Sequence, residues 1–257
     1  MLILLPPSEG KSAPRRGAPL DLERLSFPAL SPARDQVLDA LVNLCEGDRA
    51  KAAEVLGVGA TQHDLVDLNV GVRSAPAARA DRVYTGVLYD ALDAATLSAA
   101  AKRRAAPRLA VTSSVFGLVR PGDRIPAYRL SGDTALPGLG SVAGHWRDHL
   151  GPVVTDAVGR GLLVDLRSTT YVAFWRPTPD VTTAGVRVLH EHRGTRKVVS
   201  HFNKATKGRI VRALLESGAD PRTPDRLADT LRDLGWRVET GAPTRSGTVL
   251  DVVVDEL

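Results

Sequence analysis

The sequence predicts an α/β (mixed α+β) fold, with a single compact domain over residues 1–257 and a mixed central sheet wrapped by helices. Short apolar runs alternate irregularly with amphipathic stretches, which favours one sheet covered by helices. No repeat of fixed period is present, and no linker longer than a surface loop divides the chain. The 257 residues are 43% hydrophobic, which is enough to bury one large core.

Strands are expected at the short apolar runs. Residues 1–5 form such a run, and Pro6 and Pro7 stop it, which suits a buried strand. Strands near Ile3 and near Val252 should both belong to the sheet, so neither end of the chain should be removable. The further strand candidates are residues 108–113, 162–166, 186–192, 197–199, 236–240 and 249–254.

Helices are expected where capping residues precede amphipathic stretches. Ser31-Pro32 should open a helix through about residue 44, because serine caps helices and proline suits the first turn. Asp93 is expected to cap a short helix over residues 96–104, and Gly235 has the position of a C′ glycine. The other expected helices are residues 49–56, 203–216 and 224–234, whereas residues 6–28 should form an irregular surface segment.

Composition narrows the classes of partner. The net charge of +5 favours anionic partners, while 4% aromatic residues leave few platforms for stacking single-stranded bases. The single cysteine, Cys45, excludes an internal disulfide, and its position in a helix among leucines suggests an inert thiol. His145 and His149 share a helix face without a third ligand nearby, so no metal and no cofactor are expected. No apolar run is long enough to span a bilayer, and a cytoplasmic monomer is expected.

The glycine–lysine pair after the first strand is a candidate anion contact. Gly10-Lys11-Ser12 invites comparison with a phosphate-binding loop, but that motif requires glycine where this chain has Leu5. The segment that follows is rich in proline and cannot begin a helix. Lys11 is therefore expected to act as a single cation beside the end of a strand.

The helix over residues 203–216 contributes two further candidate cations. Its buried stripe is defined by Ile210, Val211, Leu214 and Leu215, and Lys204 and Lys207 fall on the same side. Lysines near the start of a helix oppose its dipole, which favours an anion bound between them; the alternative is that both extend to solvent. By this angular argument Arg209 and Arg212 lie on the opposite face.

Two loops complete the set of candidates. Arg120, Tyr128 and Arg129 flank a Pro/Gly/Asp loop after a strand; each arginine is expected to contact phosphate or, alternatively, to pair internally with Asp123. Gly138 and Gly140 lie in a turn similar to a helix-hairpin-helix, in which glycines let the backbone approach a phosphate. A plain glycine-rich loop is the alternative, because the residues before this turn do not look helical.

Five segments resemble the YaaA family in order and spacing. The most specific runs from Ser113 to Pro121 and continues through Tyr128-Arg129-Leu130. The others are the opening strand with residues 6–11, residues 84–89, residues 166–171 and residues 204–212, with departures from the family pattern at Val87, Thr170 and Lys207. The resemblance implies an α/β fold with a basic cleft, DNA binding through a helix-hairpin-helix-like element and protection during peroxide stress. It also implies a role for Arg212.

Two hypotheses for function follow. The first is a peroxide-stress protein that binds double-stranded or distorted DNA in a positively charged cleft. The second is an enzyme that acts on a nucleotide-like or other anionic small molecule in the same cleft. A duplex-binding protein should carry its cations along a surface, whereas an enzyme should bury them with perturbed ionisation. The candidate residues are Lys11, Arg120, Tyr128, Arg129, Gly138, Gly140, Lys204, Lys207 and Arg212.

Overall fold

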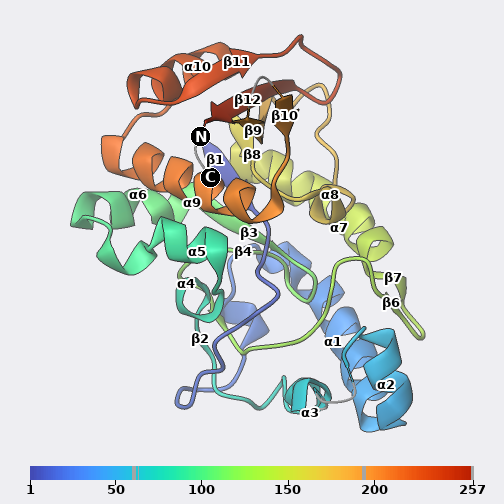
Figure 1. The fold of residues 1–257 in the computed structure, drawn as a ribbon. Coiled ribbons are helices and arrows are strands. Elements are labelled where there is room, and N and C mark those ends of the chain that lie inside the picture. The colour runs from blue at the N-terminus through green and yellow to red at the C-terminus, as the bar shows by residue number, and fades with distance from the viewer. Residues whose placement is uncertain (60–61, 63, 193–194, 256–257) are drawn as a thin grey trace.

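The central sheet joins the two ends of the chain. A computed structural model describes residues 1–59, 62, 64–192 and 195–255, and within these ranges only the backbone of residues 200–202. In the described chain the sheet has eight strands in the order β11–β12–β9–β8–β1–β3–β4, with β10 paired to β9 (Figure 1). The strands are β1 (Leu2–Leu5), β3 (Leu109–Ser113), β4 (Gly117–Val119), β8 (Leu163–Asp165), β9 (Thr183–His192), β10 (Thr195–Lys197), β11 (Arg237–Thr240) and β12 (Thr248–Val254).

The middle of the sheet is parallel and its edges are antiparallel. β12, β9, β8, β1 and β3 run in one direction, and β11, β10 and β4 pair antiparallel with their neighbours. From β1 the chain passes to β3 on one side and later returns to β8 on the other. The order of strands therefore reverses beside β1, which is where open α/β sheets bind ligands.

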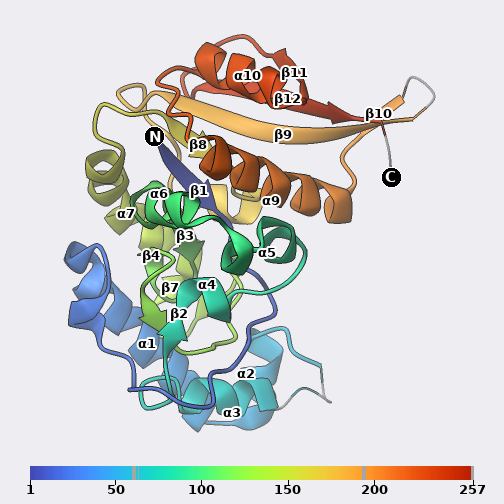
Figure 2. The ribbon, with the colours of Figure 1, turned by 90° about the vertical axis from the view of Figure 1, so that its left-hand side faces the viewer.

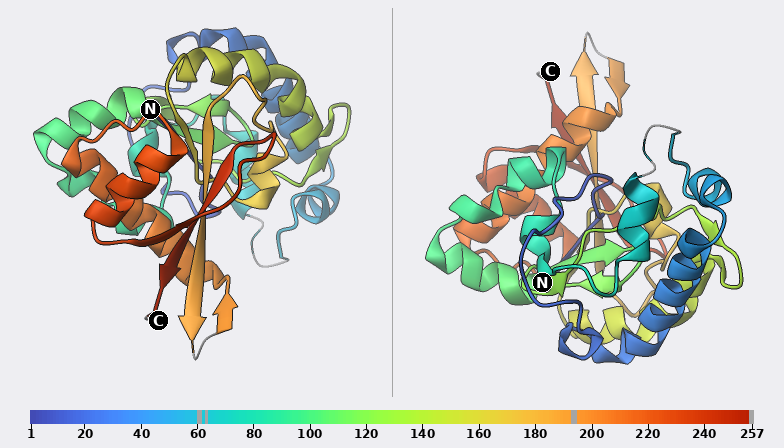
Figure 3. Two further views of the ribbon diagram at one scale, coloured as in Figure 1. Left: turned by 90° about the horizontal axis from the view of Figure 1, so that it is seen from above. Right: turned by 90° about the horizontal axis from the view of Figure 1, so that it is seen from below.

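Helices cover both faces of the sheet. Viewed along the sheet, α6 and α9 lie on one side and α1 and α7 on the other (Figure 3). α10 packs against β11 and β12 at the end of the sheet, and α9 packs along β9 (Figure 2). These elements are α1 (Ser31–Glu46), α6 (Ala99–Arg108), α7 (Val142–Val158), α9 (Ser200–Ser217) and α10 (Pro224–Asp233).

Shorter elements lie in the connections between β1 and β8 and directly after β8. The short helices are α2 (Arg49–Val55), α3 (Asp64–Val70), α4 (Ala80–Val83), α5 (Val87–Leu92) and α8 (Thr169–Val172), with 3₁₀ turns at Leu22–Arg24, Pro28–Leu30 and Ala94–Thr96. Two small antiparallel sheets have two strands each: one pairs β2 (Ala78–Arg79) with β5 (Arg124–Ile125), and the other pairs β6 (Ala135–Leu136) with β7 (Gly140–Ser141). None of the described helices combines the length and apolar character needed to cross a membrane.

The core confirms the predicted apolar faces. Every residue of β1 is buried, and the α9 stripe of Ile210, Val211, Leu214 and Leu215 is fully buried. α9 also packs closely on α5, where a Cβ atom at Gly208 would come within 2.2 Å of the carbonyl oxygen of Leu88. A side chain at position 208 would therefore push the two helices apart.

The predicted mixed α/β architecture is confirmed, with four local differences. Ser98, and not Asp93, caps α6, since its side chain accepts a hydrogen bond from the amide of Ala101. α7 continues past residue 150 to Val158, and the strand expected at residues 197–199 lies instead at Thr195–Lys197. The turn at Gly138 and Gly140 belongs to the β6–β7 pair, and the described residues 126–134 before it contain no helix. The single domain over residues 1–257 stays a prediction.

Candidate functional site

Polar residues gather where the central parallel strands end. The carboxyl ends of β1, β3 and β8 meet at one edge of the sheet, because these strands are neighbours and run in the same direction. β1 continues into residues 6–11, β3 ends at Ser113, and β8 continues into residues 166–168. Three of the segments that the sequence singled out are thus brought to one edge of the sheet.

Lys11 lies at the centre of this group. Its Nζ donates a hydrogen bond to the carbonyl oxygen of Ser8 at 2.8 Å, and it lies 4.1 Å from the ring centroid of Tyr128 and 5.8 Å from that of Tyr84. The backbone of Lys11 forms a β-bridge with Tyr84, which fixes the start of the side chain. Burial lowers the pKa of the Lys11 ammonium to about 7, which the nearby Glu9 carboxylate opposes and Arg129 reinforces. A large fraction of Lys11 is therefore an uncharged amine near neutral pH.

Three buried hydroxyl groups form a chain beside Lys11. The hydroxyls of Tyr84 and Tyr128 are 3.0 Å apart, and the Tyr128 hydroxyl is 2.8 Å from Oγ of Ser113. Because Ser113 Oγ also accepts the amide of Phe116, its own proton is available to Tyr128. Burial raises the pKa of both tyrosines, so their phenols stay protonated near neutral pH and can donate hydrogen bonds to a ligand.

Arg129 adds a second cation next to the hydroxyls. Its guanidinium pairs with Glu9, whose side chain is 60% exposed, while that of Arg129 is only 21% exposed. The Nε of Arg129 is buried and lacks a hydrogen-bond partner. The backbone amide of Arg129 donates to Oδ1 of Asn69 at 2.8 Å, and Nδ2 of Asn69 donates to the backbone carbonyl oxygen of Arg129 at 2.7 Å. This backbone clamp positions the guanidinium without using its side-chain donors.

Lys207 lies near the end of β8 and is buried. Its Nζ donates to the carbonyl oxygen of Leu166 at 3.0 Å, and burial lowers its pKa to about 8, against the attraction of Asp165. Asp165 itself forms a buried ion pair with Arg167 at 2.7 Å. Arg167 also donates to the carbonyl oxygens of Tyr171 and Trp175, which fixes the loop after β8. We call Lys11, Tyr84, Ser113, Tyr128 and Arg129 the lysine–tyrosine site, and Lys207 supports the loop beside its edge of the sheet.

The remaining predicted cations point to other partners. Arg120 donates to the carbonyl oxygens of Ala106 and Pro107 at the end of α6 and lies over the ring of Phe27. Arg212 donates to the carbonyl oxygens of Leu92 and Asp93, where it caps α5. Neither arginine makes a recorded contact with the lysine–tyrosine site. Asp123 accepts the backbone amide of Arg120 and both the amide and the hydroxyl of Ser26, and Arg129 pairs with Glu9. Within the described residues, the ion pairs expected with Asp123 are therefore absent.

Lys204 and the glycine turn lie outside the site as well. Lys204 is exposed on α9 whereas Lys207 is buried, so the two lysines do not form the expected pair. Gly138 and Gly140 have φ angles of 79° and 82°, and nothing lies within 4 Å of a Cβ atom built at either position. The turn is thus open to solvent, and the helix that follows it, α7, is capped by Ser141.

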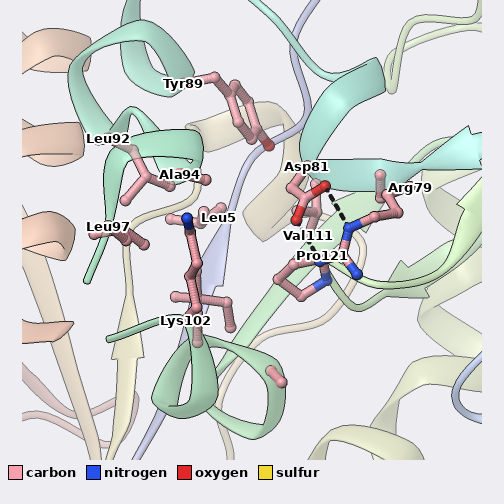
Figure 4. Close-up of a pocket in the computed structure, with 14 residues that line it drawn as sticks. Leu5, Arg79, Asp81, Tyr89, Leu92, Ala94, Leu97, Lys102, Val111 and Pro121 are labelled. Carbon is pink, nitrogen blue, oxygen red and sulfur yellow. Dashed lines mark hydrogen bonds and ion pairs between the residues drawn. The ribbon is translucent and has the colours of Figure 1, made fainter. Parts of the chain in front are cut away.

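A separate apolar pocket lies behind the tyrosines. Tyr89, Leu92 and Leu97 line it together with Leu5 at the end of β1, and its enclosed volume is about 70 Å³ (Figure 4). Lys102 also lines it, as do Arg79 and Asp81, which form an ion pair (Figure 4). The Tyr89 ring stacks on that of Tyr84, with centroids 5.5 Å apart, and therefore separates the pocket from the lysine–tyrosine site.

Reasoning from residue patterns named Lys11, Tyr128 and Arg129 but not the other two residues of the site. Tyr84 and Ser113 entered only through the family resemblance, and Glu9 was not considered as a partner of Arg129. A signal was available for Ser113, because polar residues directly after a buried parallel strand face the ligand edge of a sheet. No local pattern could bring Tyr84 next to Tyr128, since their contact joins residues far apart in the chain.

Comparisons with known proteins show which family the chain resembles. Residues 1–241 match the family described as Peroxide stress protein YaaA. A UPF0246 protein of Streptomyces coelicolor is 54% identical over the full length of both chains. A UPF0246 protein of Corynebacterium efficiens is 44% identical over 93% of this chain and 95% of its own, and one of Corynebacterium glutamicum is 39% identical over 98% and 100%.

Fold and site together define an α/β protein with a polar site at the carboxyl edge of its central parallel strands. The matches extend over nearly all of the chain and include that site. The chain belongs to the peroxide stress protein YaaA family, which includes UPF0246 proteins. The family's name associates this chain with peroxide stress.

Proposed function

We propose that this protein acts in the response to peroxide as an enzyme on a nucleotide-like, phosphate-bearing small molecule, which binds at the lysine–tyrosine site. The observation that carries the proposal is the half-buried Lys11 amine, placed against Tyr84 and Tyr128 at the carboxyl edge of β1. Buried cations with perturbed ionisation are typical of sites that act on a ligand. Exposed cations along a surface would instead favour binding of a duplex.

The charges around Lys11 support an anionic ligand. Arg129 repels the Lys11 ammonium electrostatically, and the carboxylate of Glu9 attracts it more strongly than Arg129 repels it. Glu9 is largely exposed, and an exposed ion pair contributes about 0–1 kcal/mol. A ligand phosphate can therefore replace Glu9 on Arg129 at little cost, and it can also use the buried Nε, which has no other partner.

Binding of nucleoside monophosphates and of inorganic phosphate, measured by calorimetry, tests this proposal. The variant Arg129→Gln should weaken binding about tenfold or more, because a charged hydrogen bond is worth about 1.5–3 kcal/mol. Arg187→Gln is the matched control, since Arg187 also forms an exposed ion pair, with Asp251, away from the site. Equal affinity in the two variants, or no binding by the parent protein at millimolar ligand, would refute the proposal.

Binding of double-stranded or distorted DNA is the second candidate. The net charge of +5 and the exposed side chains of Lys204 and Arg209 on α9 favour it, as does the open backbone of the turn at Gly138 and Gly140. Gel-shift titrations of a duplex at several salt concentrations test it. If Lys204 and Arg209 contact phosphates, replacing both with alanine should reduce the log–log salt slope by about 0.9 per contact.

A charge-matched control separates contact from diffuse attraction. Lys51→Ala with Arg187→Ala removes the same charge from exposed positions on α2 and β9. An equal loss of duplex affinity in both double variants would indicate diffuse electrostatic attraction and not a binding surface on α9.

A further inference from the structure

We propose that the Lys11 amine forms an imine with the aldehyde carbon of a phosphorylated sugar bound at the lysine–tyrosine site. This inference rests on the proposed function and names the reactive group of its ligand. The aldehyde can come from a free sugar phosphate or from a sugar that has lost its base within a DNA strand. Both sources present the same carbonyl and phosphate groups.

The position of Lys11 suits a nucleophile. Its side chain is half-buried, so a ligand can reach it, and its Nζ is held by the carbonyl oxygen of Ser8 and the faces of two tyrosine rings. Within the described residues, Lys11 forms no ion pair with a carboxylate. The nearby carboxylate of Glu9 pairs with Arg129. Lysines become nucleophilic when burial favours the free amine, which is the direction of the pKa shift here.

Imine formation moves protons from nitrogen to oxygen and releases water, and at this site it takes place beside the hydroxyl chain. The nitrogen lone pair attacks the carbonyl carbon, the carbonyl electrons move to oxygen, and one proton passes from nitrogen to that oxygen. This hydroxyl and the second proton of the nitrogen then leave together as water while the nitrogen lone pair forms the carbon–nitrogen double bond, so that amine plus aldehyde gives imine plus water. The hydroxyls of Tyr84 and Tyr128 stay protonated, because burial raises their pKa values, and they can donate hydrogen bonds to the oxygen as it departs.

Arg129 accounts for the phosphate of this ligand. Arg129 follows Tyr128 directly in the chain, and its positive charge lowers the pKa of Lys11. A sugar phosphate would thus place its aldehyde at Lys11 and its phosphate at Arg129 in place of Glu9. An aldehyde without phosphate lacks the second contact and should react more slowly.

Reductive trapping on the full chain tests the inference. The protein is incubated at pH 7.5 with 2-deoxyribose 5-phosphate and cyanoborohydride, and modified lysines are located by peptide mass mapping. Modification of Lys11 should exceed that of the exposed Lys51 and Lys204 by about tenfold or more, because more of its amine is uncharged. Peptide mapping of the parent protein gives this answer even if a variant fails to fold.

Further arms separate the possible sources and failures. A duplex with one abasic site, trapped with borohydride and examined on a denaturing gel, distinguishes a strand from a free sugar, and Lys11→Arg should abolish the product in either arm. Modification of Lys11 no greater than that of the exposed Lys51 and Lys204, or trapping that survives Lys11→Arg, would overturn the inference. Calorimetric binding of 2-deoxyribitol 5-phosphate, which has no aldehyde, reports on the proposed function alone. If this compound binds and no trapping occurs, the imine is refuted and the anion site stands.

Discussion

The Nζ of Lys11 lies 4.1 Å from the ring centroid of Tyr128, and Tyr128 holds both Tyr84 and Ser113 through its hydroxyl. A protonated lysine is attracted to such a ring, but burial counteracts this attraction and lowers the lysine pKa. The contact therefore joins a group that titrates near neutral pH to hydroxyls that do not. This combination has consequences for stability as well as for ligand binding.

The first prediction concerns stability against pH. Lys11 has a pKa of about 7 when folded and 10.5 as its ordinary value, so between these values the unfolded chain binds more protons. The free energy of unfolding should then rise with pH, by up to about 1.4 kcal/mol per unit for one group. Lys207, with a pKa of about 8, adds to the rise from pH 8 upward. Urea unfolding between pH 7 and 9 measures this slope.

Two variants check the assignment of that slope. Lys11→Met should reduce it, and the exposed Lys204→Met should leave it unchanged. The range ends at pH 9 because the raised pKa values of Tyr84 and Tyr128 oppose the trend only above their ordinary value of 10.0. Unfolding free energies of the parent protein that stay flat from pH 7 to 9 would contradict the prediction.

The second prediction concerns the hydroxyl chain. Tyr128→Phe removes the oxygen shared by Tyr84 and Ser113 and should cost about 1–2 kcal/mol of stability, since two buried hydroxyls lose a partner. It should also weaken phosphate-ligand binding in calorimetry. Tyr89→Phe is the matched control, because the hydroxyl of Tyr89 donates its hydrogen bond to the carbonyl oxygen of Pro6. Unchanged ligand affinity in Tyr128→Phe would show that the tyrosine hydroxyls do not take part in ligand binding.

The third prediction concerns the contact between α5 and α9. Gly208→Ala places a Cβ atom 2.2 Å from the Leu88 carbonyl oxygen, so the helices must separate. The cost should be about 1–3 kcal/mol, as for other overpacked interiors. Arg209→Ala, at the next and exposed position of α9, should change stability by about 0.5 kcal/mol or less. Thermal unfolding measures both, and equal shifts in the two variants would contradict the packing argument.

The fourth prediction concerns Cys45. Its thiol is buried and burial raises the pKa of that thiol, so little of it is present as the reactive thiolate. The variant Cys45→Ser should keep any resistance to hydrogen peroxide that the parent protein confers on a deletion strain. Loss of resistance in that variant, with unchanged thermal unfolding, would show that Cys45 chemistry contributes.

Local patterns predicted the strands and long helices well and the site only in part. β1 and α9 follow from an apolar run and from helical periodicity, which are properties of neighbouring residues. The angular argument was right for Lys207, which lies on the buried side of α9, and it failed for Lys204, which is exposed near the start of that helix. α4 and α5 are only four and six residues long, which is too short for a periodic signal. Tyr84 lies between these two helices in the chain.

The place of β1 in the sheet has a consequence for synthesis. Its partners in the sheet begin at Leu109 and Leu163, so the four apolar residues of β1 leave the ribosome long before either neighbour exists. During that interval this hydrophobic segment is unpaired and can be captured by chaperones or by other nascent chains. The Lys11 loop that follows β1 is equally unformed until residues 163–165 have been made. Slow translation before that point should therefore lengthen the period in which the chain can aggregate.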